Sequence, residues 1–344
     1  IVEERKMKGI RKMLAAAVAV AALAGGSVAR AEPYDDGVNQ RAYTAMKGKK
    51  VAFVPLSMGF DLTQGWAAAM KVQADAMGYE LIIRDPNWST DAGAQQITQL
   101  ISQKPDIIVV HNPDRNAYAR LLKRVQGQGI KVLQVNLKSE TTTEAFVGVD
   151  WYKIGEHQAN SVVEACKGKS GKVAIMQGRV TDPANFITVQ AVKDVFAKHP
   201  EIQVVSDQSS EWDATKAQGI AATALKQNPD MCGIVGLWDN MDVGTAAAIR
   251  EAGLTGKVFL SSSGGGRKQA DCDMVESGTF DEVVIYDVAR QGRDLNAAIA
   301  FLLQQDGEAK VNPFALITPL KVVTKANLKP NSCWQMEQIP DLVQ

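Results

Sequence analysis

The sequence lacks the residue patterns that metal sites and redox sites need. Its 344 residues include three histidines, which are scattered and show neither an H-x-x-x-H spacing nor an arrangement with carboxylates typical of a metal site. Its four cysteines form no C-x-x-C pair, which argues against thioredoxin-like redox chemistry and against a zinc cluster. We therefore expect no metal ion and no cofactor.

Two segments are similar to catalytic motifs, but each lacks a glycine that the motif requires. Gly168-Lys169-Ser170 is similar to the end of a phosphate-binding loop, but Val163 stands where the first glycine belongs, and the segment precedes a strand. The serine run 261–263, at the start of an expected loop over 261–266, lacks the leading glycine of a nucleophile elbow. From these gaps we expect that the protein is not an enzyme.

A long apolar run is missing as well. The run at 14–24 has 11 residues and is too short for a stable membrane anchor. Basic residues precede it and Ala29-Arg30-Ala31 follows it, so we predict a secretory signal peptide over 1–31, cut after Ala31. Because no cysteine follows the run, we expect no lipid anchor and a mature chain that is free in solution.

The chain has no excess of positive charge. Removing residues 1–31 takes six basic and two acidic residues from the 38 of each, which leaves a net charge of −4. That balance argues against a nucleic acid or an anionic membrane surface as a partner. A transcription regulator would carry a helix-turn-helix where the predicted signal peptide lies, so we exclude that class.

The cysteines are compatible with export. Cys166, Cys232, Cys272 and Cys333 are even in number, and an oxidising compartment would allow them to pair. Three pairings are possible, and the sequence does not choose among them. Four buried free thiols remain an alternative.

The sequence does contain a regular alternation of short apolar strands and amphipathic helices. It starts with a strand at 50–56, a loop at 57–65, a helix at 66–77 and a helix-ending glycine, Gly78. Further strands are expected at 79–84, 107–110, 131–135, 145–150, 172–176, 203–205, 233–237, 258–260 and 282–286. Helices are expected at 91–102, 118–126, 151–165, 185–198, 213–226, 242–252 and 292–304. This alternation predicts parallel sheets. About 313 residues remain after cleavage, which is more than one small hydrophobic core needs and therefore favours two domains.

Several short segments occur in an order and spacing typical of one family. They are 76–79, 106–109 with Asn112-Pro113, 148–150 with Gly155, 176–178, 212–213 and 239–244. In these segments the chain resembles the periplasmic sugar-binding proteins of ABC transporters, specifically the ribose-binding-protein-like family, over nearly the whole mature length.

The resemblance implies a type I periplasmic binding protein fold, which is α/β with two doubly wound parallel-sheet lobes joined by three crossing segments. We expect lobe 1 to comprise 32–148 plus 288–320, and lobe 2 to comprise 149–287 plus 321–344. The implied function is that of a periplasmic, monomeric solute-binding protein of an ABC importer. Such a protein captures a small neutral sugar or polyol by hinge closure and delivers it to an ABC permease in the inner membrane.

Ligands of open parallel sheets bind beyond the carboxyl ends of the strands, and this edge supplies our candidate site. The candidates are Phe60, Asp61, Asn112, Asn136, Asp150, Asn185, Trp238, Asp239, Ser263 and Tyr286. Ribose-binding members use aromatic, arginine and aspartate residues where this chain has Leu62 and Thr63, Asn136 and Leu137, 186–188, and Ser263 and Gly264. Ribose itself is therefore a poor match, and a polyol or an unusual monosaccharide fits better.

Each candidate also has a structural interpretation. Asp150 and Asp239 are suited to cap helices, and Tyr286 alternates with buried valines. Trp66, Trp88, Trp151 and Trp212 stand at helix starts as packing residues, with Trp88 and Trp212 also placed to rim the gap between lobes. Two alternative functions stay open: a signalling receptor of the same fold for an autoinducer-like ligand, and an exported enzyme.

Overall fold

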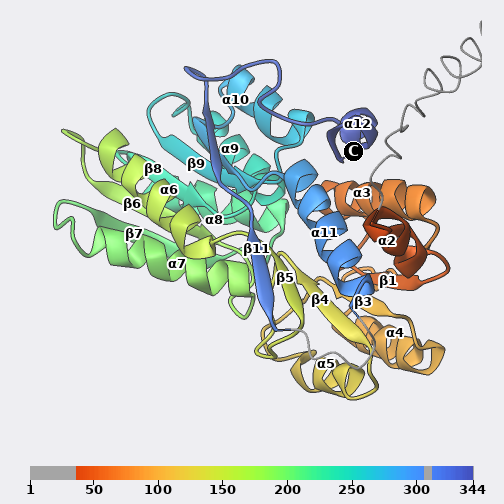
Figure 1. The fold of residues 1–344 in the computed structure, drawn as a ribbon. Coiled ribbons are helices and arrows are strands. Elements are labelled where there is room, and N and C mark those ends of the chain that lie inside the picture. Colours follow the sequence, from red (N-terminus) through yellow and green to blue (C-terminus); the bar gives the residue numbers. More distant parts are fainter. Residues whose placement is uncertain (1–35, 306–311, 344) are drawn as a thin grey trace, which may run out of the picture. The chain divides into compact units, whose positions relative to one another are not determined.

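The computed structural model describes residues 36–305 and 312–343. The predicted signal peptide, 1–31, lies outside the described residues. The two sheets and the helices that cover them belong to one compact unit, 42–344. Figure 1 shows the two lobes that these sheets form.

The first sheet has six strands in the order β11-β5-β4-β3-β1-β2. Its strands are β1 (Lys50–Val54), β2 (Glu80–Ile83), β3 (Ile107–Val110), β4 (Lys131–Val135), β5 (Ala145–Gly148) and β11 (Phe314–Ile317). Each neighbouring pair is parallel. All strand carboxyl ends therefore lie at one edge of this sheet.

The second sheet repeats the plan in the order β12-β10-β9-β8-β6-β7. Its strands are β6 (Lys172–Gln177), β7 (Gln203–Ser209), β8 (Gly233–Gly236), β9 (Phe259–Gly264), β10 (Glu282–Ile285) and β12 (Lys321–Thr324). Only β12, paired with β10, runs antiparallel within this sheet of the described chain. The expected architecture of two parallel-sheet lobes is confirmed.

Helices cover both sheets. Those of the first sheet are α3 (Asp61–Met77), α4 (Thr90–Gln103), α5 (Ala119–Gln126), α11 (Val288–Leu303) and α12 (Ile339–Val343). Alternate residues of β1 point to different clusters: Val51 and Phe53 pack toward α3 and α11, whereas Ala52 and Val54 pack toward α4 and α5. That double burial is why the strand reads as a continuous apolar run.

Four longer helices pack on the second sheet. They are α6 (Trp151–Ala165), α7 (Pro183–Phe196), α8 (Ala214–Gln227) and α9 (Asp239–Glu251), followed by the short η1 (Lys268–Cys272) and α10 (Asp273–Ser277). α6 packs against α7, and α8 against α9. Close approach of α6 and α7 requires Gly155, where a Cβ would lie 2.3 Å from the carbonyl oxygen of Thr188.

The chain passes between the two sheets three times. It leaves the first sheet between β5 and α6, returns between β10 and α11, and leaves again between β11 and β12. The last segment holds η2 (Met336–Gln338) and α12, and α12 packs on α3 and α11 of the first lobe.

Several of the expected element boundaries are wrong. The expected loop over 57–65 ends early, because α3 begins at Asp61, and α9 begins at Asp239 rather than at 242. The expected loop 261–266 is largely strand, since β9 runs to Gly264. The lead-in to the first strand contains a helix, α2 (Val38–Met46).

The cysteines form two disulfides, Cys166–Cys232 and Cys272–Cys333, with Cα atoms 5.3 Å and 6.0 Å apart. Both join segments that flank strands or helices of the second lobe. The pairing left open by the sequence is thus settled, and the free-thiol alternative is wrong.

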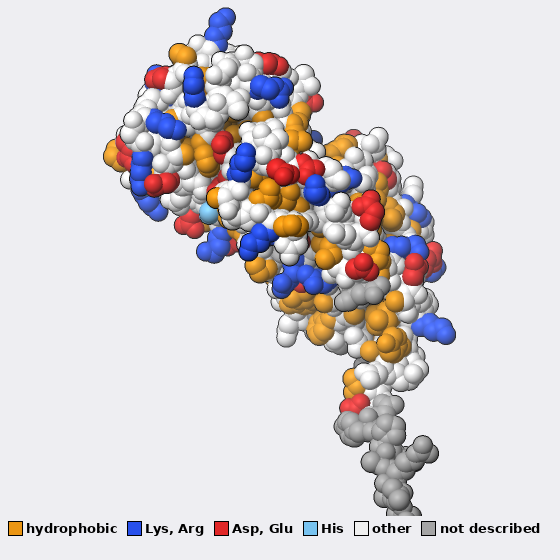
Figure 2. All heavy atoms as spheres, turned by 90° about the horizontal axis from the view of Figure 1, so that it is seen from above, with side chains coloured by type: hydrophobic (Ala, Val, Ile, Leu, Met, Phe, Trp, Pro, Cys, Tyr) orange, Lys and Arg blue, Asp and Glu red, His pale blue; other side chains and the backbone are white. Residues whose placement is uncertain are grey.

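Acidic and basic side chains are interspersed on the face drawn in Figure 2. None of the helices in residues 36–305 and 312–343 combines the length and the apolar character that a membrane-spanning helix needs.

Candidate functional site

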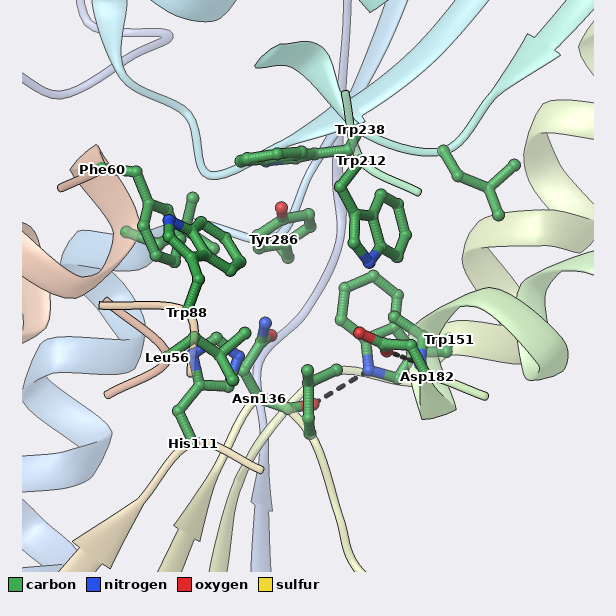
Figure 3. Close-up of a pocket in the computed structure, with 14 residues that line it drawn as sticks. Leu56, Phe60, Trp88, His111, Asn136, Trp151, Asp182, Trp212, Trp238 and Tyr286 are labelled. Atoms are coloured by element: carbon green, nitrogen blue, oxygen red, sulfur yellow. Dashed lines mark hydrogen bonds between the residues drawn. The ribbon is translucent and has the colours of Figure 1, made fainter. Parts of the chain in front are cut away.

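The carboxyl ends of both sheets meet around one cavity, which we call the interlobe cavity. It holds about 430 Å³ of space between atoms, part of which is open to solvent. It is lined by Leu56, Phe60, Leu62, Trp88, His111, Asn136, Leu137, Trp151, Asp182, Ala184, Trp212, Leu237, Trp238 and Tyr286. Figure 3 shows these side chains arranged around the central space.

Six of these residues form what we call the aromatic wall: Phe60, Trp88, Trp151, Trp212, Trp238 and Tyr286. Four of the six tryptophans of the chain belong to it. Because only 6% of the chain is aromatic, this concentration at one site is far from an even distribution.

The rings of the aromatic wall touch across the two lobes. Phe60 stacks on Trp88 with ring centroids 5.0 Å apart, and it meets Trp238 edge-on at 5.9 Å. Trp238 also meets Trp212 edge-on at 6.0 Å. Edge-to-face and offset geometries at these distances are the favourable ones for aromatic pairs. Since Phe60 and Trp88 come from the first lobe and the other two from the second, the structure represents closed lobes.

Trp88 and Trp212 reach the cavity through the same unusual backbone. Each follows the edge strand of its sheet, β2 or β7, and each has a positive φ, +66° and +68°. The residues before them, Asn87 and Glu211, are also left-handed. Such a conformation costs about 1–3 kcal/mol in a residue with a side chain, and it is found mainly at functional sites.

Few polar groups face the cavity. Asn136 has a left-handed backbone, φ +60°, and its carbonyl oxygen accepts a hydrogen bond from Trp151 Nε1 at 2.9 Å (Figure 3). Its side-chain Oδ1 is buried, and no partner for it occurs among the described residues. This amide is therefore available to a ligand.

Asp182 contributes the one carboxyl group of the lining. It caps α7 by accepting a hydrogen bond from the Ala184 amide at 2.9 Å, and it also accepts one from Trp212. Burial raises its pKa to about 7, against the lowering effects of the Ala184 amide and of Arg179. Near neutral pH this group can be a hydrogen-bond donor or an acceptor.

His111 is a neutral member of the lining. It lies edge-on to Trp66 with ring centroids 5.1 Å apart, and burial lowers its pKa to about 3. Both of its ring nitrogens are without a hydrogen-bond partner in the described part of the chain. The tyrosine of the wall, Tyr286, is 2% exposed, and burial raises its pKa well above the usual range.

The structure brings four of the ten sequence candidates to the cavity: Phe60, Asn136, Trp238 and Tyr286. Asn112 instead donates to Gln134 Oε1 and to the Leu137 carbonyl, at 2.9 and 2.8 Å.

Three further candidates are engaged in local hydrogen bonds outside the lining. Asn185 accepts a hydrogen bond from the Gly178 amide at 2.8 Å, and the Ser263 hydroxyl donates to the Leu237 carbonyl at 2.9 Å. Asp150 caps α6 by accepting from the amides of residues 152 and 153.

The remaining two candidates, Asp61 and Asp239, belong to a buried group of carboxyls that also includes Asp271. We call these three residues the acid cluster; they are 5%, 1% and 0% exposed. Asp239 and Asp271 share a hydrogen bond. Burial and mutual repulsion raise the pKa of Asp239 well above its usual range, and that of Asp271 to about 7.

The acid cluster also joins the two lobes. Asp61, from the first lobe, is hydrogen-bonded to Asn240 of the second, and the charge of Arg267 partly offsets the burial that raises its pKa. Asp61 and Asp239 line a second hollow between the lobes, beside the interlobe cavity. Despite its three carboxyls, no arrangement suited to a metal ion occurs among the described residues.

The sequence candidates omitted several lining residues. Trp151, His111 and Asp182 were not included, and Trp88 and Trp212 were expected only at the rim. A signal for the last two was present in the sequence, because Asn87-Trp88-Ser89 and Glu211-Trp212-Asp213 follow equivalent strands and precede equivalent helices.

The model of the periplasmic binding protein domain matches residues 51–309. This match covers well over half of the chain, so the chain belongs to that family. The fold, with two parallel-sheet lobes and a cavity between them, is that of a type I periplasmic binding protein.

Among curated proteins, the chain is similar to the D-allose-binding periplasmic protein of Escherichia coli strain K12, with 28% identity over 190 residues. That match covers 54% of this chain and 58% of the relative. A xylitol-binding protein of Mycolicibacterium smegmatis is 26% identical over 234 residues, covering 67% of this chain and 66% of the relative. The matched regions thus span less than two thirds of these relatives.

A solved structure supports the same fold. It is an ABC transporter solute-binding protein from Burkholderia graminis in complex with D-arabinose. It superposes with a TM-score of 0.75 at 23% identity, covering 83% of this chain and 98% of that chain.

Proposed function

We propose that the protein is the periplasmic solute-binding component of an ABC importer that captures a neutral sugar or polyol between its two lobes. The ligand would be held in the interlobe cavity, and the closed protein would deliver it to a membrane permease. Membership of the family and the sugar and polyol ligands in the names of the relatives support this function.

The observation that carries the proposal is the pair Trp88 and Trp212. One tryptophan from each lobe is held in a left-handed conformation beside the same cavity. Packing of a hydrophobic core gives no reason for the same backbone strain at corresponding places in both lobes. Binding of one ligand between two aromatic side chains, one from each lobe, does give a reason.

Hinge closure gives the capture step a physical basis. In an open form, the ring contacts between Phe60 and Trp238 and the Asp61–Asn240 hydrogen bond are broken, because each joins the two lobes. A ligand that contacts both lobes binds the closed form better and so shifts the population toward it. We propose hinges at the three crossings, with lobe boundaries near 148, 288 and 320 and with α12 returning to lobe 1.

A thermal-shift screen of residues 32–344 against neutral sugars, polyols, amino acids and metal salts tests the function. A ligand that binds only the folded protein raises the melting temperature by mass action. We expect hits among neutral polyhydroxylated or ring-shaped compounds. Hits confined to amino acids or metal ions would contradict the proposal, and turnover of a hit would favour the exported-enzyme alternative.

A further inference from the structure

We infer, resting on the proposed function, that the interlobe cavity selects a neutral ring compound with apolar faces and few hydroxyl groups. A deoxygenated or methylated sugar belongs to this class, and so does a simple ring alcohol. The inference depends on the apolar surface that the cavity presents to a ligand and on the small number of hydrogen-bonding groups in its lining.

The cavity offers mainly ring faces and aliphatic surface. Besides the aromatic wall, its lining includes five aliphatic side chains: Leu56, Leu62, Leu137, Ala184 and Leu237. Tryptophan and tyrosine faces bind the C–H surfaces of a ring by dispersion and apolar burial. Each additional methyl group on the ligand would be buried against apolar side chains of the lining.

The cavity withholds the hydrogen-bonding groups that hydroxyl-rich sugars need. Polar side chains next to the lining in sequence are largely used within the protein. The Ser263 hydroxyl donates to the Leu237 carbonyl, the Thr63 hydroxyl donates to the Ser57 carbonyl, and the Asn112 amide nitrogen donates to Gln134. Of these three side chains, Asn112 keeps a buried oxygen, Oδ1, without a partner among the described residues.

Four polar groups remain to contact a ligand: the Asn136 amide, the Asp182 carboxyl, the Tyr286 hydroxyl and the neutral His111 ring. A fully hydroxylated pyranose has more donors and acceptors than these groups can pair. Each buried hydroxyl left unpaired weakens binding by roughly five- to 150-fold.

The charges around the cavity point to a neutral guest. The lining defined from the described residues includes no lysine and no arginine. Its one carboxyl group, Asp182, has a pKa raised to about 7 and accepts a hydrogen bond from the Ala184 amide, and the acid cluster is close enough for its charges to raise the pKa of Tyr286. An anionic ligand would therefore find no basic side chain in the lining to pair with its charge.

Isothermal titration of residues 32–344 with matched pairs of sugars tests the inference. One pair is D-galactose and D-fucose, which lacks one hydroxyl; the other is D-glucose and its methyl glycoside. We expect the hydroxyl-poor member of at least one pair to bind at least fivefold more tightly, within the range for one unpaired hydroxyl. Tighter binding of both parent sugars would overturn the inference and leave the proposed function intact.

Two further probes separate the failure of this inference from the failure of the function. Benzyl alcohol binding, with no sugar binding, would support the apolar-ring chemistry and contradict a sugar-binding function. Tetramethylammonium binding more tightly than every ring compound would overturn the inference in favour of an organic cation held by the aromatic wall. Absence of binding by all probes at millimolar concentration would contradict both.

A variant links the preference to the aromatic wall. Trp238→Gln replaces a ring face with an amide, so the ratio of affinities for the two members of a pair should fall at least threefold. Phe301→Ala is the control, because Phe301 is 47% exposed on α11 and does not belong to the lining. A ratio of affinities is insensitive to the fraction of protein that is folded. An unchanged ratio in Trp238→Gln would contradict the role assigned to the wall.

Discussion

Trp88 and Trp212 occupy corresponding places in the two lobes, each in the segment that follows the edge strand of its sheet and each with a left-handed backbone, at φ +66° and +68°. Their rings reach the same cavity from opposite lobes (Figure 3). The strained backbone at both positions places one tryptophan from each lobe beside the cavity, which is the arrangement expected for capture of a ring-shaped ligand.

Loss of a wall residue should weaken binding without unfolding the protein. Trp238 is partly buried, and its ring contacts Phe60, Trp88 and Trp212. We predict that Trp238→Ala raises the dissociation constant of the best ligand roughly thirtyfold, corresponding to about 2 kcal/mol for a central aromatic residue. Titration calorimetry measures this change, with circular dichroism as the check on folding. Unchanged affinity would make Trp238 a structural residue only.

Gly178 offers a test of how Trp212 is positioned. A Cβ at this position would lie 2.3 Å from three atoms of the Trp212 ring, so Gly178→Ala must displace the ring. We predict at least tenfold weaker ligand binding. Gly219→Ala is the matched control: it lies within α8, nothing is within 4 Å of its Cβ, and it should stabilise the helix by about 0.5–1 kcal/mol. Equal ligand affinity in both variants would contradict a role for Trp212.

Much of the fold follows from the sequence alone. The strands Ile107–Val110 and Lys131–Val135 and the helix Trp151–Ala165 lie where the apolar pattern predicts them, and Gly78 ends α3 with a φ of +75°. Continuous apolar runs and helix-ending glycines are local signals, so they can be read without knowledge of tertiary contacts.

The errors arise where tertiary contacts override local signals. Gly65 suggested a loop, but it lies within α3, where a Cβ would come 2.5 Å from Val288 of α11. Ser261 to Ser263 suggested a loop at the site, yet their hydroxyls donate to Glu282, Asp242 and the Leu237 carbonyl from within β9. Which side chain at a strand end points into a cavity depends on packing that sequence spacing does not encode.

The two disulfides should affect the protein differently. They join residues 66 and 61 positions apart, so each is expected to stabilise the fold by a similar amount, about 4 kcal/mol. Only Cys333 adjoins Trp334, whose Nε1 donates to the Gly265 carbonyl at 2.8 Å, next to the acid cluster. We predict that the Cys272→Ser/Cys333→Ser variant loses ligand affinity.

The Cys166→Ser/Cys232→Ser variant is the control for that prediction. Cys232 directly precedes β8, at the end of the sheet opposite to the cavity. Thermal unfolding should show a comparable fall in melting temperature for both double variants, whereas calorimetry should show weakened binding for the first only. Equal affinities would remove any link between the second disulfide and the site.

The buried carboxyls predict a dependence of stability on pH. The pKa of Asp271 is raised from 3.8 to about 7, so between these values the folded state holds a proton that the unfolded state has lost. Raising the pH through this range therefore lowers the free energy of unfolding. Asp182 and Asp242, whose pKa values are also raised to about 7, act in the same direction.

We expect a lower melting temperature at pH 8 than at pH 5, and a shallower decline in Asp271→Asn. Asp75→Asn is the control, since the Asp75 side chain is 65% exposed. Differential scanning calorimetry across this range measures both profiles. Parallel profiles for Asp271→Asn and the unaltered protein would show that the acid cluster does not titrate as described.

Small-angle X-ray scattering of residues 32–344, with and without the tightest-binding sugar or ring alcohol, tests the central claim most directly. Closure of two lobes on a guest predicts a smaller radius of gyration in the presence of ligand, and a scattering curve that then matches the closed structure. An identical radius of gyration in both samples, at a ligand concentration that saturates binding by calorimetry, would contradict capture by hinge closure.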